Sequence, residues 1–600
     1  MTARPNEPKN LEDVLKLRFS DLQPEHLKYF PKMTGWFNPL LLSKLLLNVI
    51  VSKLFGQYAD RRLIHAALDK QTPDASRAQT DLQAKTKRTD GDVWIDYVAD
   101  LGDGFDATYA IAHLLAQPSL AVPGVDEPLP RGGVLMMGGD QVYPTASRVD
   151  YKSRLRRPYD LAWPGNANEE SPPLLAIPGN HDWYDGLVVF LAIFCRGKET
   201  YIGNWATKQT RSYFSARVAP KWYIWGIDIA LVRDMDQPQA DYFIDAANHM
   251  EDGSNIILCS AEPGWYEAEK QGDSFQTLGY AATIARKAER HLRVPLVLSG
   301  DSHHYARYAG ANSEFITSGG GGAFLHGTLE LKDHITTDWL TERNAELRLA
   351  KAYPSKDDSR ALLDKHSRFL SLNPEFSLML GTVYWLFTFI LTQLPRWDTA
   401  LIIYLVMLAA FWGYVAYQEK RFDWSTLRQS VVHTGAHFLA ILILVWASSA
   451  LRLWANSALL KPFALNDFHW LAWAVLLLPV IPLGTVLGGT IFGEYLRISC
   501  KRLDRNHNDA FSAMKLDSHR NFLRIRIRAN EVTVFPICVD RVPERSGWRR
   551  NPEPGPDRPS VFEPVEPLNP RLIEPAIRVD ASQALKASDI DESAKIPTPQ

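Results

Sequence analysis

The chain has 600 residues, too long for one ordinary domain, and its 66 Lys and Arg nearly balance 68 Asp and Glu, leaving a net charge of −2. This balance provides no global field to recruit nucleic acid, so we expect no nucleic-acid partner. The four cysteines are far apart in sequence and include no CxxC pair, which excludes a disulfide scaffold and suits a reducing compartment.

Residues 1–88 are predicted to form an N-terminal helical region. The first residues mix charges and prolines without an apolar core, so we expect no signal peptide. In the segment 39–55, Lys44, Asn48 and Ser52 recur every four residues and leave the rest of the helix surface apolar. This pattern predicts a helix that lies in a membrane interface or packs on membrane spans, and an ordinary core helix is an equally good interpretation.

Residues 89–330 contain four short apolar runs, typical of strands, each followed by polar residues at a turn. The polar residues are Asp100, Asp140, the pair Asn180 and His181, and His303. Carboxylate, amide and imidazole groups at converging strand ends suit the hydrolysis of a phosphate ester with two metal ions. One such turn is often only local hydrogen bonding, but four in succession predict a metal centre.

These segments resemble the sequence blocks of the calcineurin-like metallophosphoesterases, and especially of their purple acid phosphatase branch. The matching segments are Asp100-Leu-Gly102, Gly139-Asp140-Gln-Val-Tyr143, Gly179-Asn180-His181-Asp182 and Gly300-Asp301-Ser-His303-His-Tyr305-Ala-Arg307. Two further segments, which begin at Met235 and Phe315, also look like the family, so the resemblance spans roughly residues 90–325. It implies an α/β (α+β) fold: a four-layer β-sandwich flanked by helices.

The resemblance also implies roles for individual residues. One metal ion would be held by Asp100, Asp140, His303 and Tyr143, and a second by Asp140, which bridges, and Asn180. Asp301 would be a further metal ligand. His181 would polarise or protonate the leaving group. Asp182 would hydrogen-bond His181 and set the tautomer of its ring. Asn180, His181 and Arg307 would contact the substrate. The cofactors expected are two divalent metal ions (Mn, Fe or Zn), with Mn favoured.

Two positions depart from the family pattern. Asp301 stands where the family has a metal-binding histidine, and a carboxylate there favours harder ions such as Mn²⁺ or Mg²⁺. The segment Ala261-Glu262-Pro263 lacks the family's histidine, and whether Glu262 reaches the second metal stays open because adjacent strand residues point to opposite faces. Asp103 is either an extra ligand or a turn residue, and the turn is favoured.

Residues 331–375 are predicted to form a helical linker, and 376–497 a transmembrane bundle. Four apolar runs, 376–394, 399–417, 431–454 and 468–496, each reach the roughly 20 residues that cross a bilayer. His433 and His437 share a face of the third run, and we interpret them as buried polar residues rather than metal ligands.

The loops between these runs predict an orientation. Basic residues concentrate before the first run, between the second and third, and after the fourth. The positive-inside rule then places both flanking regions in the cytoplasm, on a multi-pass protein of the inner or plasma membrane.

The C-terminal part is expected to contain two further regions. Residues 498–545 are predicted to form a small cytoplasmic domain with a β-hairpin of strands 522–527 and 532–539, whose alternating arginines would face solvent. Residues 546–600, rich in proline and charge and without periodicity, are predicted to be a disordered tail.

Together these patterns predict a membrane-anchored, metal-dependent phosphoric ester hydrolase acting on a mono- or diester. The substrate would be a phosphorylated small molecule or a lipid-linked phosphate, and membrane lipid would be a partner; the oligomeric state is open. The alternative is a degenerate relative that senses a phosphorylated ligand or serves as a membrane scaffold. A transporter with a regulatory domain is the least favoured interpretation, since the runs show no convincing repeat.

Overall fold

The computed structural model describes residues 8–44, 80–83, 91–165, 171–196, 199–207, 209–230, 233–270, 272–310, 312–340, 342–455 and 469–581. The chain divides into two compact units. The first unit comprises Met1–Thr34, Leu47–Lys356 and Asp517–Gln600, and the second comprises Gly35–Leu46 and Asp357–Leu516.

The first unit contains a nine-stranded mixed sheet in the order β1-β9-β10-β11-β12-β14-β13-β16-β15. Its central pairs, β10 with β11, β11 with β12 and β12 with β14, are parallel. The strands are β1 (Thr80–Asp81), β9 (Phe214–Ala219), β10 (Trp222–Gly226), β11 (Asn255–Cys259), β12 (Arg293–Ser299), β13 (Tyr305–Gly310), β14 (Ser313–Ser318), β15 (His334–Trp339) and β16 (Glu342–Tyr353).

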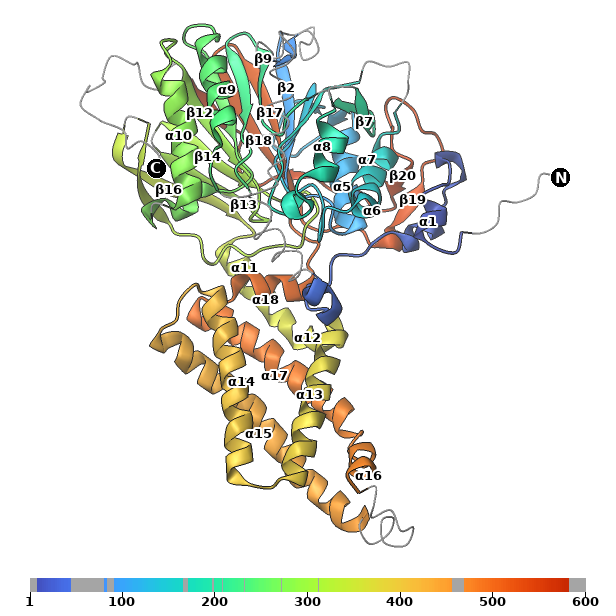
Figure 1. Cartoon of the computed structure of the whole chain (residues 1–600). Coiled ribbons are helices and arrows are strands. Elements are labelled where there is room, and N and C mark those ends of the chain that lie inside the picture. Colours follow the sequence, from blue (N-terminus) through green and yellow to red (C-terminus); the bar gives the residue numbers. More distant parts are fainter. Residues whose placement is uncertain are drawn as a thin grey trace, which may run out of the picture. The chain divides into compact units, whose positions relative to one another are not determined.

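A second sheet of the same unit has seven strands in the order β21-β18-β17-β2-β5-β6, with β22 also paired to β18. The pairs β2–β5 and β5–β6 are parallel, and β17 is antiparallel to β2. Figure 1 shows the red C-terminal strands beside blue β2. The strands are β2 (Val93–Val98), β5 (Val134–Met137), β6 (Leu174–Ala176), β17 (Arg520–Arg528), β18 (Glu531–Val539), β21 (Arg571–Leu572) and β22 (Ile577–Asp580).

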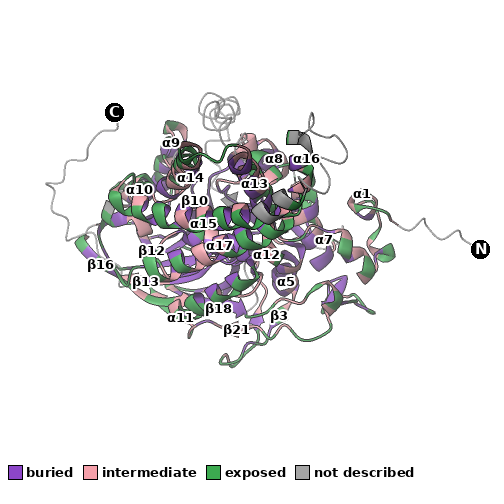
Figure 2. Ribbon diagram, turned by 90° about the horizontal axis from the view of Figure 1, so that it is seen from below, coloured by how far each residue is buried: buried purple, intermediate pink, exposed green. Residues whose placement is uncertain are grey.

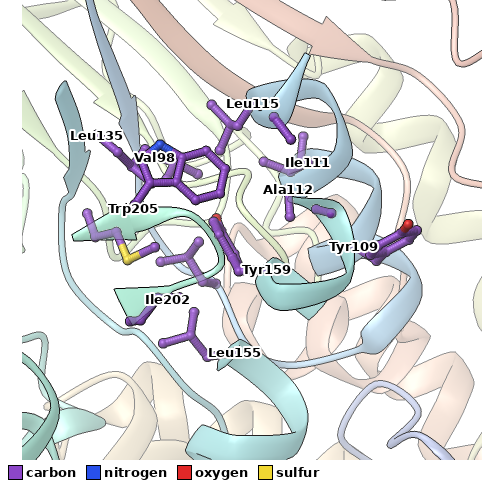
Figure 3. Packing of buried hydrophobic residues seen from close by; sticks show 14 of the residues in the cluster. Val98, Tyr109, Ile111, Ala112, Leu115, Leu135, Leu155, Tyr159, Ile202 and Trp205 are labelled. Atoms are coloured by element: carbon purple, nitrogen blue, oxygen red, sulfur yellow. The ribbon is translucent and has the colours of Figure 1, made fainter. Parts of the chain in front are cut away.

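The two sheets pack face to face through one buried apolar cluster, to which Ile95 and Leu523 contribute from one sheet and Ile224 and Ile257 from the other. A second cluster covers the outer face of the seven-stranded sheet, where helices α5 (Phe105–Ala116), α7 (Arg157–Ala162) and α8 (Val188–Phe194) pack, as Figure 3 shows in part. A third cluster joins the outer face of the other sheet to α9 (Gln237–Asn248) and α10 (Asp273–Lys287). The mixed α/β class expected from the sequence is confirmed.

The N-terminal residues form short helices: α1 (Leu11–Val14), η1 (Phe19–Asp21) and η2 (Pro24–Tyr29). In the expected interfacial helix, 39–55, residues 39–44 are helical, and the remainder lies outside the described residues. Short paired strands also occur: β3 (Ser119–Leu120) with β4 (Leu129–Pro130), β7 (Thr200–Ile202) with β8 (Trp205–Thr207), and β19 (Trp548–Arg550) with β20 (Phe562–Pro564).

The helical linker predicted for 331–375 is wrong in its first half. β15 and β16 form a hairpin at the edge of the nine-stranded sheet, and in β15 buried and exposed residues alternate strictly. That alternation has the period of a half-buried strand. Helical structure begins only with α11 (Lys356–Leu362), followed by η7 (Leu363–Arg368) and α12 (Phe369–Leu372).

The separate small domain predicted for 498–545 is also wrong, although its hairpin is present as β17 and β18. β17 pairs with β2 and thereby joins the sheet formed by the N-terminal half of the chain. Its arginines do not all face solvent: Arg520 and Arg524 are fully buried. Residues up to 516 belong instead to the helical second unit, which includes α18 (His507–Met514).

The disordered tail predicted from residue 546 is wrong as far as residue 581, where the described part ends. This segment contains β19 to β22 and lies against α5, where the Tyr109 hydroxyl donates to the carbonyl of Phe562 at 2.7 Å. Phe562 and Trp548 are buried. Proline and charge dominate the composition, but a few large aromatic side chains provide enough apolar area to hold the segment in place.

The second unit contains helices α13 (Pro374–Gln393), α14 (Trp397–Gln418), α15 (Trp424–Ala455), α16 (His469–Leu476) and α17 (Val480–Leu503). Among the described residues, three helices are long and apolar enough to cross a membrane: Pro374–Gln393, Trp397–Gln418 and Trp424–Ser448. Figure 2 shows exposed residues along α14 and α15, in contrast to the mostly buried strands of the first unit. The fourth expected span, 468–496, is divided between α16 and α17 by a turn at residues 477–479.

Candidate metal centre

The polar residues singled out in the sequence follow strands whose carboxyl ends meet. Asp100 follows β2, Asp140 follows β5 and Asn180 follows β6, and these three strands are adjacent and parallel. His303 follows β12 of the other sheet. The backbone N–H of Asp301 donates to Oδ1 of Asp100 at 3.0 Å, which joins the loops of the two sheets.

The hydroxyl of Tyr143 lies at the centre of this group. Its oxygen is 2.9 Å from Oδ2 of Asp140, 2.9 Å from Nε2 of His303 and 3.3 Å from Oδ1 of Asp100. Three side chains from three separate loops therefore converge on one point. The Nδ1 atom of His303 lies 2.9 Å from the carbonyl oxygen of Phe324. If that nitrogen carries the proton, Nε2 is the acceptor that faces the Tyr143 hydroxyl and is the nitrogen that can ligate a cation.

Four residues of this centre have left-handed backbone conformations. The φ angles are 56° at Asp100, 48° at Asp140, 67° at Asp301 and 47° at His303. Non-glycine residues adopt this region rarely, and such strained residues cluster at functional sites, where the surrounding structure compensates for the strain.

The glycines of the motifs allow the loops to approach closely. A Cβ atom on Gly319 would lie 2.0 Å from Oδ2 of Asp100 and 2.7 Å from the backbone nitrogen of His303. A Cβ atom on Gly179 would lie 2.1 Å from Oδ1 of Asp140. Only glycine fits at both positions, so these glycines are needed for the convergence of the carboxylates.

The electrostatics of the centre favour a bound positive charge. Burial, and then the charges of Asp140 and Asp301, raise the pKa of Asp100 well above its usual value. Burial lowers the pKa of the His303 imidazole well below its usual value, so this ring is neutral at physiological pH. A neutral imidazole beside crowded carboxylates is the protonation state that ligates a cation.

Two buried oxygen atoms at the centre, Oδ2 of Asp100 and Oδ1 of Asn180, have no hydrogen-bond partner among the described residues. Oxygen and imidazole donors of this kind fit a divalent cation such as Mn²⁺. In the described part of the chain, however, no group of three or more His, Cys, Asp or Glu side chains is arranged to hold a metal ion. The Tyr143 hydroxyl lies between the candidate donors. The oxygen and imidazole donors of the centre nevertheless fit a divalent cation. Asp100, Asp140, Tyr143 and His303 would hold it, with Asn180 next to Asp140.

His181 lies next to Asp140 and Tyr143. Its backbone N–H donates to Oδ1 of Asp140 at 2.9 Å, and its ring lies 4.3 Å from the Tyr143 ring, centroid to centroid. The Nδ1 atom is 3.1 Å from the carbonyl oxygen of Pro144. The ring is partly exposed, which suits a side chain that acts on an incoming ligand.

The role expected for Asp182, as the partner of His181, is wrong. The Asp182 carboxylate is buried and accepts from the backbone N–H groups of Gly179 at 2.9 Å and Gln141 at 3.1 Å, and from the hydroxyl of Tyr151. The carbonyl oxygen of Pro144, and not Asp182, is the hydrogen-bond partner of the His181 ring at Nδ1. Asp182 therefore fixes the two loops that carry Asp140 and Asn180.

Glu262 is engaged by other groups. It accepts from Ser274 at 2.7 Å and pairs with the guanidinium of Arg233 at 3.2 Å. Arg233 also pairs with Glu267 at 3.1 Å. Burial raises the pKa of Glu262, and the charge of Arg233 opposes that shift. Glu262, which could have held a second cation, is therefore paired with the guanidinium of Arg233.

Two further candidates have structural roles. Asp103 is buried, accepts from the backbone N–H of Thr34 at 2.7 Å and pairs with Arg154, as the favoured turn interpretation requires. Arg307 was expected to contact substrate, but its guanidinium binds Glu574 at 2.6 Å and Glu314 at 3.1 Å on the sheet. Two carboxylates neutralise this guanidinium, so the structure does not support its role in substrate binding.

Sequence reasoning missed Tyr151 and Arg233. Tyr151 lies in a π-helix (Tyr151–Arg156) and hydrogen-bonds Asp182. Arg233 lies just before the segment that begins at Met235, and nothing else in the sequence distinguishes it from other arginines. No local pattern reports these contacts, because each joins residues from different loops.

Comparisons with known proteins add little. No family model matches the chain, and no curated protein matches it. Solved structures include a match titled "GAP50 the anchor in the inner membrane complex of Plasmodium", with 13% identity and a TM-score of 0.28, covering 42% of this chain and 76% of that chain. A similarity this low carries no argument about fold or function.

Proposed function

We propose that the chain is a membrane-anchored, metal-dependent phosphoesterase of the calcineurin-like type, hydrolysing a phosphate mono- or diester. The observation that carries the proposal is the convergence of Asp100, Asp140 and His303 on the hydroxyl of Tyr143. The face-to-face sheets with helices on both outer faces agree with the sandwich that the sequence blocks imply.

The residues of the centre have separable tasks. A bound divalent cation would supply Lewis acidity and an acidified water. Asp140, which follows β5, and Asn180, which follows β6, would hold the cation through a carboxylate and an amide oxygen. His181, partly exposed and positioned by Asp140 and Pro144, would donate a proton to the departing oxygen.

Arg233 adds a positive charge near the carboxylates of this site, since it influences both Glu262 and Asp301. Because Glu262 and Glu267 already pair with this guanidinium, we assign it no role in substrate binding. The three apolar helices of the second unit favour a substrate that is itself in the membrane, such as a lipid-linked phosphate. We also propose a cytoplasmic orientation for the flanking regions, on the positive-inside pattern alone.

The test is hydrolysis of p-nitrophenyl phosphate and bis-p-nitrophenyl phosphate by the purified full chain with Mn²⁺. We expect Asp140→Asn and His181→Ala to reduce the rate by at least a hundredfold. Asp245→Asn, a substitution of a partly exposed residue on α9, serves as the control and should leave the rate unchanged. Activity that survives both site substitutions would contradict the proposal.

A second candidate, a sensor that binds a phosphorylated ligand without turnover, is favoured by the pairing of Glu262 with Arg233. Elemental analysis of the purified chain distinguishes the two. One metal per chain, with phosphate binding and no hydrolysis, supports the sensor; two metals with turnover support the enzyme.

A further inference from the structure

A cavity of about 910 Å³ opens on the helical unit between α15 and α17. Its walls are largely apolar, with Val431, Val432 and Ala436 from one helix and Ile491 and Ile498 from the other. Val432 is 74% exposed, so this wall has no protein cover among the described residues. The space has the size of a site for a small organic molecule or a hydrocarbon chain.

The mouth of the cavity is basic. Arg428 and Arg505 line it, and neither forms an ion pair with any described residue. Arg505 is held by neutral partners, Oε1 of Gln429 at 2.9 Å and Oγ of Ser425 at 2.8 Å. The acidic lining residue, Glu494, is paired with Arg497 at 2.7 Å. Two guanidinium groups therefore remain available for an anion.

One residue of the cavity wall, His433, carries a buried polar atom without a partner among the described residues. His433 is 3% exposed, and its Nδ1 atom has no hydrogen bond among the described residues. Its Nε2 lies 3.0 Å from Nε2 of His437, whose Nδ1 lies 2.6 Å from the Tyr384 hydroxyl. If Tyr384 donates to His437, and His437 in turn to His433, then Nδ1 of His433 carries a proton and is a donor.

The His433 ring is held in this position by its neighbours. It stacks on Tyr495, with ring centroids 3.6 Å apart and the planes within 6° of parallel, and on its other side lies Phe411 at 4.1 Å. Gln429 further joins the two helices through Tyr495 at 2.9 Å and Ser499 at 2.8 Å. These contacts fix the part of the cavity wall to which His433 belongs.

We infer that this cavity is a binding site for one anionic glycerophospholipid of the surrounding bilayer. Its phosphate would lie between Arg428 and Arg505, and an acyl chain would follow the apolar wall. Charge complementarity and an apolar cavity on a helix that can cross a membrane together select a lipid rather than a soluble anion.

The experiment uses the full chain in detergent, stripped of lipid, and native mass spectrometry with phosphatidylglycerol and phosphatidylcholine. We expect at least tenfold tighter binding of phosphatidylglycerol, and about fivefold loss for each of Arg428→Gln and Arg505→Gln. Arg502→Gln, an exposed residue of α17 that does not line the cavity, is the matched control and should retain full binding.

Equal binding of the two lipids would overturn the inference, as would an Arg502→Gln effect as large as those of the mouth arginines. Displacement of the lipid by inorganic phosphate alone would identify a soluble anion site instead.

Discussion

The guanidinium of Arg524 on β17 forms two hydrogen bonds with the carboxylate of Asp96 on β2, at 2.7 and 3.1 Å, across 428 residues of sequence. Both side chains are buried, and Asp96 also accepts from the backbone N–H of Gly132 at 2.9 Å. This pair fastens the C-terminal hairpin to the sheet that carries Asp100, so the chain on both sides of the helical unit builds the sheet that supports the candidate centre.

Asp96→Asn should therefore destabilise the first unit by about 3–5 kcal/mol, because it leaves the guanidinium of Arg524 buried without a counter-charge. Urea unfolding of the detergent-solubilised chain measures the loss. Arg541→Gln, which changes an exposed arginine, is the control and should cost less than about 0.5 kcal/mol. The double substitution with Arg524→Leu should cost less than the two single losses together; simple additivity would show that the pair is not coupled.

Tyr143→Phe tests the hydroxyl on which the candidate ligands converge. Removing it should weaken Mn²⁺ binding and slow hydrolysis by about ten- to a hundredfold, since Asp100, Asp140 and His303 lose the group that positions them. Titration calorimetry with Mn²⁺ and the aryl phosphate assay measure the two effects. Tyr280→Phe on α10 is a matched control, because that ring is 38% exposed. Tighter Mn²⁺ binding by Tyr143→Phe would show that the hydroxyl competes with the cation.

Gly319→Ala should disrupt the centre by steric collision. The added methyl group would meet Oδ2 of Asp100 at 2.0 Å, so the loop of β14 must move away and separate the carboxylate from His303. We expect a loss of about 1–3 kcal/mol of unfolding free energy and of at least tenfold in activity. Gly279→Ala on α10 meets nothing within 4 Å and should stabilise the chain by about 0.5–1 kcal/mol. Equal behaviour of the two variants would refute the close approach.

The sequence predicted local patterns well and their long-range partners poorly. The strand-end residues Asp100, Asp140 and His303 stood out because each follows an apolar run, and the structure brings them together. The long apolar runs that form α13, α14 and α15 were equally easy to identify in the sequence. The placement of β17 was not, because Arg524 resembles a solvent-facing residue until its partner Asp96 is known.

The same limit explains the error at the C-terminal segment. Its composition is that of a disordered chain, yet Phe562 is buried against Tyr109. A few aromatic anchors are invisible in averaged composition. The partner of Glu262, Arg233, likewise comes from another loop, so the local sequence did not indicate this pair.

His113 on α5 gives a prediction about pH. Its Nδ1 lies 2.8 Å from Oγ of Ser560 in the C-terminal segment, and burial lowers the pKa of the imidazole to about 4. The unfolded chain binds a proton at His113 near pH 6.5, while the folded chain does so only near pH 4. The unfolded state therefore binds more protons in this window, and the contribution of His113 to stability falls as the pH drops from about 6.5 to about 4.

His113→Gln keeps a polar side chain near Ser560 and removes the titration. The unfolding free energy of the wild type relative to this variant should fall by roughly 2 kcal/mol between pH 7 and pH 5, and should change little below pH 4. Urea unfolding of both chains across this pH range measures this difference in unfolding free energy. The titration of every other group cancels in the difference, because both chains share those groups. Because the shift arises from burial under the C-terminal segment, a constant difference between the two chains would mean that residues 546–581 do not cover α5 in solution.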